Sequence, residues 1–206
     1  MLTTALIVLP LAGAIVVWIL PLSRESTSGL ALLVALAEVG LWLGSARNFD
    51  FSSDVPQYAT SRDWFDQLGI SYSVGLYGFQ FWLVGLTIVV GASAIGYGAW
   101  AERERSRAYF GLLLFLVGSL VGVFAAQDLI VFYVFCEAML IPIYVLGGGW
   151  GGPQRVKATV TFVLYTMAGS LLMLASIVAL GISKGTFELA DLGTSSNDWI
   201  FLGFLA

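Results

Sequence analysis

Long apolar runs separated by short polar connections dominate this sequence. Six of them come near the roughly 20 residues that a helix needs to cross the hydrocarbon core of a bilayer. They cover residues 2–20, 29–46, 78–100, 108–126, 129–146 and 158–181, and a seventh begins near Trp199. None shows the period-two alternation of a barrel strand. The sequence therefore predicts an all-α integral membrane protein, a polytopic helix bundle with about six complete transmembrane helices and the start of a seventh.

Composition argues against the water-soluble enzyme classes. Hydrophobic residues make up 59% and charged residues 11% of the 206 residues, whereas soluble domains average about 25% charged residues. The single cysteine, Cys136, and the absence of histidine argue against a disulfide framework, a zinc or iron–sulfur site and haem in this chain. We therefore expect no cofactor in this chain, no nucleic acid as a partner, and a lipid bilayer as its surroundings.

The connections predict one membrane domain over residues 1–206. Only 47–77 and 182–198 are long enough to hold structure of their own. The run G-G-G-W-G-G at 147–152 lacks the Lys-Ser or Lys-Thr ending of a phosphate loop, so we interpret it as a flexible turn. Glu102 and Glu104 alternate with arginines and are expected to be solvated.

Basic residues predict the orientation of the chain. Six lie in the connections after the first, third and fifth runs (Arg24, Arg103, Arg105, Arg107, Arg155 and Lys157), and three lie on the opposite side (Arg47, Arg62 and Lys184). Two of those three share a long loop with Asp50, Asp54, Asp63 and Asp66. Cytoplasmic loops carry the excess of lysine and arginine, so we expect the N-terminus outside. The first run lacks a charged start and a cleavage site, which favours a retained helix over a signal peptide.

Glu137 is a carboxylate in the middle of an apolar run. It lies eight residues into the run 129–146, about 12 Å deep at the helical rise, too far for its short side chain to reach the headgroups. Intramembrane carboxylates usually mark ion paths or proton relays. The alternative is a buried acid held by a neighbouring basic residue for packing.

The surroundings of Glu137 fit proton handling. Tyr133 and Tyr144 lie on the same helical face and could hydrogen-bond the carboxyl or hold water. Pro142 lacks the amide that would bond the carbonyl of Ala138, which predicts a kink and a free acceptor beside Glu137.

Two further acidic residues fall within or beside predicted spans. Asp128 begins the fifth span, where an acidic helix cap is the favoured interpretation and a proton-path role the alternative. Glu38 is central in the second span, where its depth argues for function but no accompanying polar pattern does. A proton role and a packing role therefore stay open for Glu38.

Three sequence elements resemble a known family. They are F-Y-V-F-C-E-A-M-L-I-P-I-Y, W-G-G, and F-V-L-Y-T-M-A-G-S-L-L-M-L. Together they closely resemble subunit M of proton-pumping NADH:quinone oxidoreductase, respiratory complex I, which is called chain 4 in mitochondria. The resemblance covers most of residues 68–206.

That resemblance implies the first part of an antiporter-like fold of about fourteen helices built from two inverted repeats. It implies that Glu137 matches a glutamate that pairs with a lysine in a broken seventh helix of a proton channel. NADH, FMN, iron–sulfur clusters and quinone would then belong to partner subunits, and other membrane subunits would be partners in a bacterial plasma membrane.

The chain also departs from the family pattern. Tyr77 stands where the family usually has aspartate before the third helix, so a role for that loop acid is in doubt. The sequence given stops at Ala206, before the expected lysine and the whole second repeat, and we expect Lys157 and Lys184 to lie in loops. We hypothesise a truncated product, a split subunit or an incomplete sequence that does not pump alone. The alternatives are a subunit of a multi-subunit sodium/proton antiporter or membrane-bound hydrogenase, and a non-transporting structural fragment.

Overall fold

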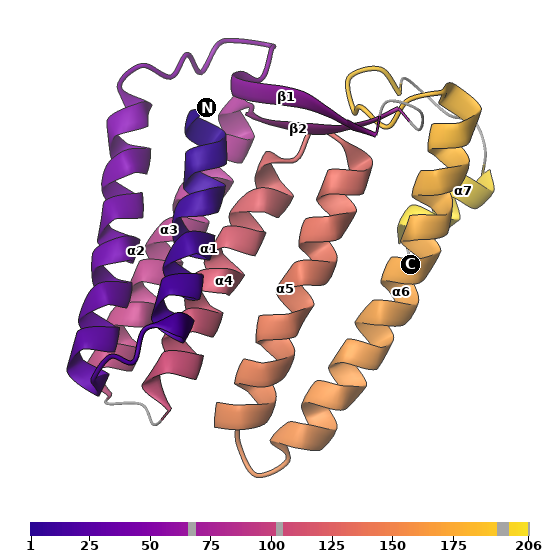
Figure 1. Ribbon diagram of the computed structural model, residues 1–206. Coiled ribbons are helices and arrows are strands. Elements are labelled where there is room, and N and C mark those ends of the chain that lie inside the picture. Colours follow the sequence, from indigo (N-terminus) through magenta and orange to yellow (C-terminus); the bar gives the residue numbers. More distant parts are fainter. Residues whose placement is uncertain (66–68, 102–104, 193–197, 206) are drawn as a thin grey trace. The chain divides into compact units, whose positions relative to one another are not determined.

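The structure is a computed structural model that describes residues 1–65, 69–101, 105–192 and 198–205, and these residues form seven helices and one β-hairpin. The helices are α1 (Leu2–Ile19), α2 (Arg24–Ala46), α3 (Gly78–Trp100), α4 (Ser106–Ala125), α5 (Leu129–Trp150), α6 (Arg155–Lys184) and α7 (Asp198–Leu205) (Figure 1). Within these residues, six helices are long and apolar enough to cross a membrane. The predicted helical membrane architecture is therefore confirmed. Asp66, Glu102, Arg103 and Glu104 lie outside the described residues.

The long connection between α2 and α3 holds an element that the sequence analysis did not predict. Strands β1 (Gln57–Phe65) and β2 (Ile70–Leu76) pair as a two-stranded sheet. Gly69, at the start of the return, has φ +65°, a conformation that glycine adopts without steric cost.

Two helices are longer than predicted because they include polar first turns. Helix α2 begins at Arg24 rather than residue 29, since the Ser23 hydroxyl caps it by accepting the Ser26 N–H at 3.3 Å. Helix α6 spans 30 residues from Arg155 to Lys184. The prediction that Lys157 and Lys184 lie in loops was therefore wrong: they occupy its first and last turns. Long basic side chains fit such positions because the stem stays apolar while the ammonium reaches water.

The prediction of a flexible glycine turn at 147–152 was wrong for residues 147–150, which are helical. Helix α5 continues through Gly147, Gly148 and Gly149 to Trp150, and the Gly151 amide closes it by donating to the Gly147 carbonyl at 3.1 Å. Glycine costs a helix roughly 1 kcal/mol relative to alanine. In an apolar span, however, an unpaired backbone group costs more, so continuing the helix is favourable.

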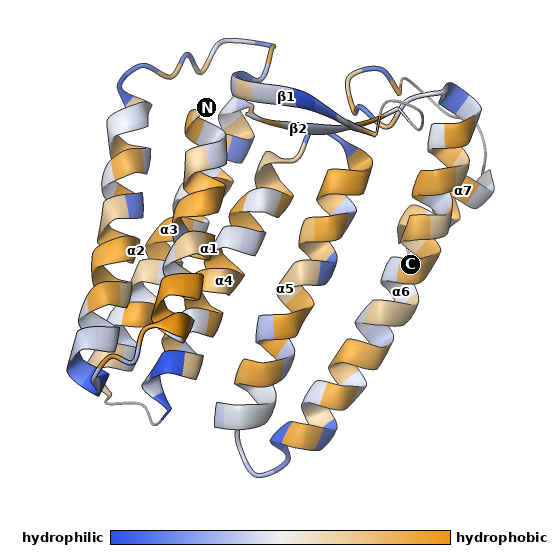
Figure 2. Ribbon diagram, viewed as in Figure 1, coloured by the Kyte–Doolittle hydropathy of each residue, from blue (hydrophilic) through white to orange (hydrophobic). Residues whose placement is uncertain are grey.

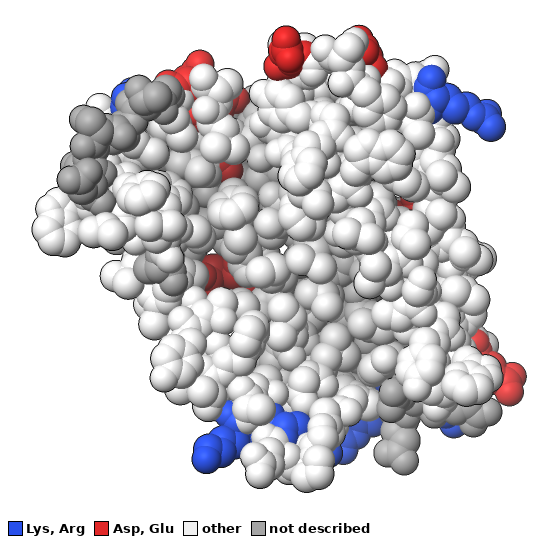
Figure 3. Space-filling view, turned by 180° about the vertical axis from the view of Figure 1, so that it is seen from behind, with Lys and Arg blue, Asp and Glu red and all other residues white. Residues whose placement is uncertain are grey.

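The chain divides into two compact units, each with its own core. The first contains residues 1–59 and 75–125, and so helices α1 to α4. Its core consists of interlocking apolar side chains from all four helices: Ala14, Val17, Ala31, Val34, Ala35, Ile95, Phe110 and Leu114. Hydrophobic colours run along most of each helix, and hydrophilic ones gather near the helix ends (Figure 2). The face seen in Figure 3 is likewise mostly uncharged.

Aromatic rings close one end of the first unit. The Trp42 indole N–H donates to the Phe81 carbonyl at 3.1 Å, which joins the end of α2 to the start of α3. The Phe49 and Phe81 ring centroids lie 4.4 Å apart. The Tyr58 hydroxyl donates to the Ser45 carbonyl at 3.0 Å and so fixes the base of the hairpin to the same end.

The second unit contains residues 60–74 and 126–206, with α5, α6 and α7 among its described residues. Its core is formed by Leu129, Ile177, Leu180, Phe187, Leu192 and Ile200. Backbone bonds hold the start of α5 on two sides: the Gln127 amide donates to Ser73 of β2, and the Leu129 amide donates to Phe187 at 3.0 Å. The start of α5 is thus fixed by two segments from distant parts of the sequence.

Candidate functional site

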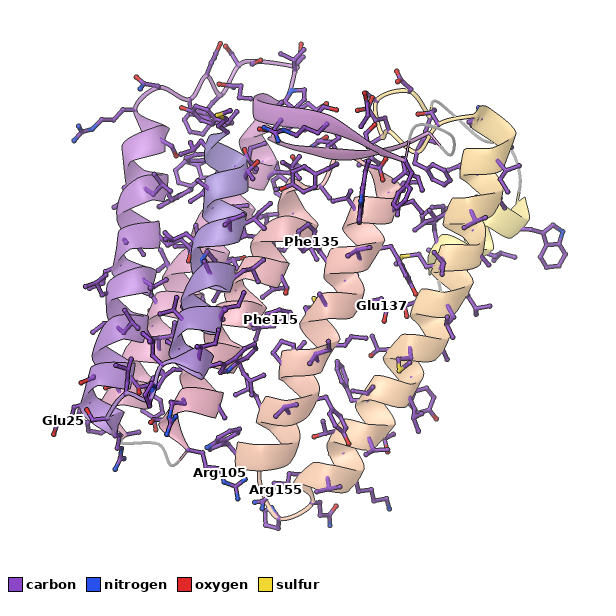
Figure 4. The ribbon with its side chains drawn as sticks, viewed as in Figure 1. Glu25, Arg105, Phe115, Phe135, Glu137 and Arg155 are labelled. Atoms are coloured by element: carbon purple, nitrogen blue, oxygen red, sulfur yellow. The ribbon has the colours of Figure 1, made fainter. Side chains whose placement is uncertain are left out.

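Glu137 lies in a groove within the second unit. Its side chain leaves α5 on the side that faces α6 (Figure 4). The groove has a volume of about 610 Å³ and is lined by Cys136, Glu137, Met139, Leu140, Phe162, Tyr165, Thr166, Gly169, Ser170, Met173 and Phe204. Helices α5, α6 and α7 all contribute to this lining, so the carboxyl group sits where three helices meet.

The carboxyl group of Glu137 is incompletely paired. Its Oε1 atom is buried and has no hydrogen-bond partner among the described residues. No lysine or arginine belongs to the described lining of the groove. A carboxylate in such surroundings is penalised by lost solvation, whereas the neutral acid can donate its proton to a nearby acceptor. Glu137 therefore presents an incompletely paired carboxyl group to an apolar groove.

Tyr133 on α5 and Ser170 on α6 are two polar residues near this acid. Tyr133 precedes Glu137 by one helical turn on α5, and Ser170 of α6 lines the same groove as Glu137. The Tyr133 ring packs against the apolar core of the second unit. Sequence analysis proposed Tyr133 from helical spacing but missed Ser170. The sequence marks Ser170 only as a small polar residue in the Y-T-M-A-G-S-L element of a largely apolar helix.

Other predicted neighbours of Glu137 are placed differently. The Tyr144 side chain is 45% exposed and is not part of the described groove lining, so the structure does not bring it to Glu137. Pro142 is buried within α5, which continues as a helix on both sides of it. The free carbonyl beside Glu137 stays a prediction.

Asp128 caps α5, as the favoured interpretation expected. It is fully buried, and its Oδ1 atom accepts the amides of Ile130 at 2.8 Å and Val131 at 3.1 Å. Its Oδ2 atom accepts the Ser71 amide from β2 at 3.3 Å. Three backbone donors therefore occupy this carboxylate, which accounts for its burial without a proton-path role.

Glu38 belongs to the first unit, and the described residues supply its side chain with no such partners. Its side chain is 1% exposed on the inner face of α2, and its Oε1 atom has no hydrogen-bond partner among the described residues. Ser45, Trp42 and Val34 share this buried face. The structure thus establishes the burial of Glu38 and leaves its role a prediction.

The described residues contain no candidate metal site, because no group of three or more Asp, Glu, His or Cys side chains among them could hold an ion. Tyr77, which replaces the expected loop aspartate, stands at the start of α3, where its amide donates to the Gln80 side chain at 3.0 Å. This position has a structural role at the helix start.

Comparisons with known proteins agree on one family. Residues 126–205, which contain Glu137 and its groove, match the family model described as NADH:quinone oxidoreductase/Mrp antiporter, TM. NAD(P)H-quinone oxidoreductase chain 4 3 of Trichormus variabilis is 36% identical over 194 residues, covering 92% of this chain and 36% of that protein. The chain therefore spans about a third of the length of the curated relatives it matches.

Solved structures show the same relationship. A chain of respiratory complex I from Thermus thermophilus with bound NADH has a TM-score of 0.79 and 33% identity, covering 99% of this chain and 42% of that chain. A chain of the Mrp complex from Dietzia sp. shares the fold, with a TM-score of 0.81 at 19% identity, covering 98% of this chain and 22% of that chain. The sequence elements, the helical architecture and these relatives agree: the chain belongs to the antiporter-like family of NADH:quinone oxidoreductase and Mrp membrane subunits and is similar to subunit M, or chain 4.

Proposed function

We propose that this chain is the proton-translocating part of a membrane subunit of an NADH:quinone oxidoreductase, with Glu137 as the group that takes up and releases the proton. The observation that carries the proposal is the Glu137 carboxyl, which lies in an apolar groove with a buried, unpaired Oε1. Buried acids inside transmembrane bundles serve ion pathways and proton relays. Relatives named as quinone oxidoreductase chain 4 supply the class of reaction.

The proposal extends to partners and location. The chain would act as a subunit of a translocase without a redox site of its own, and partner subunits would hold NADH, FMN, iron–sulfur clusters and quinone. Other membrane subunits would pack against it, in keeping with the multi-subunit complexes among its structural neighbours. The surplus of basic residues on one side supports an N-terminus outside a bacterial plasma membrane.

Glu137 substitutions in the intact membrane complex test this function. Glu137→Ala is expected to reduce pumping-coupled turnover strongly, whereas Glu137→Asp, which keeps an acid, should largely preserve it. Proton pumping is measured together with NADH oxidation. Glu25→Ala is the matched control, because Glu25 is an exposed carboxylate in the first turn of α2. Equal activity of the two Glu137 variants would remove this residue from the mechanism.

A second candidate function is transport in a multi-subunit sodium/proton antiporter, favoured by the fold shared with the Mrp complex chain. Replacing Na⁺ by choline in the same pumping assay separates the two. Proton transport that continues with NADH oxidation supports the oxidoreductase, and transport that requires a sodium gradient supports the antiporter.

A further inference from the structure

We propose that Glu38 is a second proton-binding site, a carboxyl group that holds its proton at neutral pH in the interior of the first unit. The inference is independent of the proposed role of Glu137, which belongs to the second unit. It rests on the place that the contacts of α2 give to Glu38, on the unpaired Oε1 atom of its side chain, and on the charges of the surrounding helices.

Glu38 lies between two levels at which α2 contacts its neighbours. One turn earlier, Val34 Cγ1 lies 2.9 Å from the position that a Cβ atom at Gly13 of α1 would take. One turn later, the Trp42 indole N–H donates to the Phe81 carbonyl of α3 at 3.1 Å. Residues four apart share a helix face, and Val34, Glu38 and Trp42 are all buried. Glu38 therefore lies on the face of α2 that packs inside the bundle, and its side chain is only 1% exposed.

This interior supplies the carboxyl group with no described hydrogen-bond donor for Oε1, which is buried and unpaired. Hydroxyl groups of α2, α3 and α4 donate instead to backbone carbonyls within about one turn of themselves: those of Thr27, Ser45, Thr87, Ser93 and Ser119. The other buried, unpaired side-chain oxygen described in this unit, Thr4 Oγ1, belongs to the first turn of α1. Burial without a partner costs a charged carboxylate far more than a neutral acid.

No counter-ion faces Glu38 among the described residues. Helix α1 contains no ionisable side chain. The other ionisable side chains of the surrounding helices lie near helix ends: Arg24 and Glu25 of α2, Tyr97 of α3, and Arg107 and Tyr109 of α4. Those on α2 are about 20 Å from Glu38 along the helix. The charged side chains of the connection after α2 are exposed: Arg47, Asp50 and Asp54. An ionised Glu38 would be a buried charge without compensation, so the neutral acid is the favoured form.

The species bound at Glu38 is a proton rather than a metal cation. A hard cation needs several oxygen ligands at once, and no group of three or more Asp, Glu, His or Cys side chains in the described residues could hold one. The buried side chains one turn to either side of Glu38 are the apolar Val34 and the indole of Trp42, which offer no oxygen. A proton, in contrast, needs only one oxygen of the carboxyl group itself.

Infrared difference spectroscopy of the intact membrane complex at neutral pH tests the site. A protonated carboxyl group has a C=O stretch above the amide I band that moves down in D₂O, whereas a carboxylate absorbs below that band. Subtracting the spectrum of Glu38→Gln from that of the wild type should leave an acid band and no carboxylate band. Glu38→Leu should remove the same acid band, so the result does not depend on the folding of a single variant.

Glu25→Gln is the matched control, because Glu25 is an exposed glutamate in the first turn of the same helix. Subtracting its spectrum from that of the wild type should leave a carboxylate band and no acid band. The contrast between the two positions then reports burial rather than residue type.

A carboxylate band, or no acid band, in the wild-type spectrum after subtraction of both Glu38 variants would overturn the site. A carboxylate band that is present in Na⁺ and absent in choline would overturn it in favour of a bound cation. The outcome is separate from that of the proposed function. If Glu137→Ala leaves pumping intact, the proposed function fails and the Glu38 acid band is still expected.

Discussion

The carboxylate of Asp128 accepts the backbone amide of Ser71, a residue 57 positions earlier in the chain, at 3.3 Å. The same side chain caps α5 through the amides of Ile130 and Val131. One buried side chain thereby joins the hairpin to the helix that carries Glu137. Its contribution should be visible as stability rather than as proton transport.

We expect Asp128→Ala to lower the free energy of unfolding by about 2–3 kcal/mol, because a cap is lost and the half-buried Ser71 amide loses its acceptor. Asp128→Asn keeps a side-chain oxygen for the cap and should cost less. Denaturant unfolding of the purified protein measures both. Asp50→Ala is the control, since Asp50 is exposed and, among the described residues, its carboxylate accepts the amide and hydroxyl of nearby Ser52. A similar loss in all three variants would contradict the assignment.

Glu38→Leu should stabilise the first unit by about 1–3 kcal/mol, because it removes a buried polar side chain that lacks a hydrogen-bond partner in the described residues. Glu38→Gln keeps a polar group there and should give no such gain. The melting temperature of the detergent-purified protein reports the difference. A proton role for Glu38 would appear as a loss of pumping in the more stable Glu38→Leu variant, and unchanged pumping would leave only packing.

The transmembrane helices could be predicted from sequence alone because the length of an apolar run is a strong signal in a membrane protein. The bounds of α3, Gly78 to Trp100, agree with the prediction. The start of α2 was missed because Arg24 and Glu25 look like loop residues until the Ser23 cap is considered. The glycines at the end of α5 misled for a related reason: glycine marks turns in water, but a helix in lipid keeps its backbone bonds.

Glycines near the ends of α5 and α6 give opposite predictions. Gly148→Ala places a methyl group where no atom lies within 4 Å inside a helix, so it should stabilise by about 0.5–1 kcal/mol. Gly185 ends α6 with φ +73° and equally open surroundings, so Gly185→Ala should destabilise by about 1 kcal/mol through backbone strain alone. Unfolding free energies measured side by side test the contrast. Equal signs for the two changes would contradict it.

Gly13 allows the close approach of α1 to α2 and α4. A methyl group there would lie 2.9 Å from Val34 Cγ1 and 3.5 Å from Leu114 Cδ1. Gly13→Ala should therefore destabilise by about 1–3 kcal/mol through overpacking. Gly40→Ala, on α2 with no atom within 4 Å, is the matched control and should not destabilise. Thermal unfolding compares them, and tolerance of Gly13→Ala would show that this approach is looser than the structure indicates.

The candidate site was only partly accessible from sequence. Glu137 stood out because charge is rare in an apolar run, and Tyr133 followed from helical spacing. Ser170 did not, since nothing local in the sequence reveals which face of α6 lines the groove beside α5. Tyr144 shares the periodicity of Tyr133 yet is exposed, because spacing fixes a helix face but not the extent of the neighbouring helix's contact.

The length of α6 sets its relation to the membrane. Its 30 residues extend about 45 Å at the helical rise, whereas the hydrocarbon layer is about 30 Å thick. An upright α6 would therefore project several residues beyond the acyl chains, and a tilted one would bring its ends back toward the headgroups. Arg155 and Lys157 at one end and Lys184 at the other are suited to that boundary. The depth of Ser170, and with it the depth of the groove that it lines together with Glu137, depends on how this excess length is divided between the two leaflets.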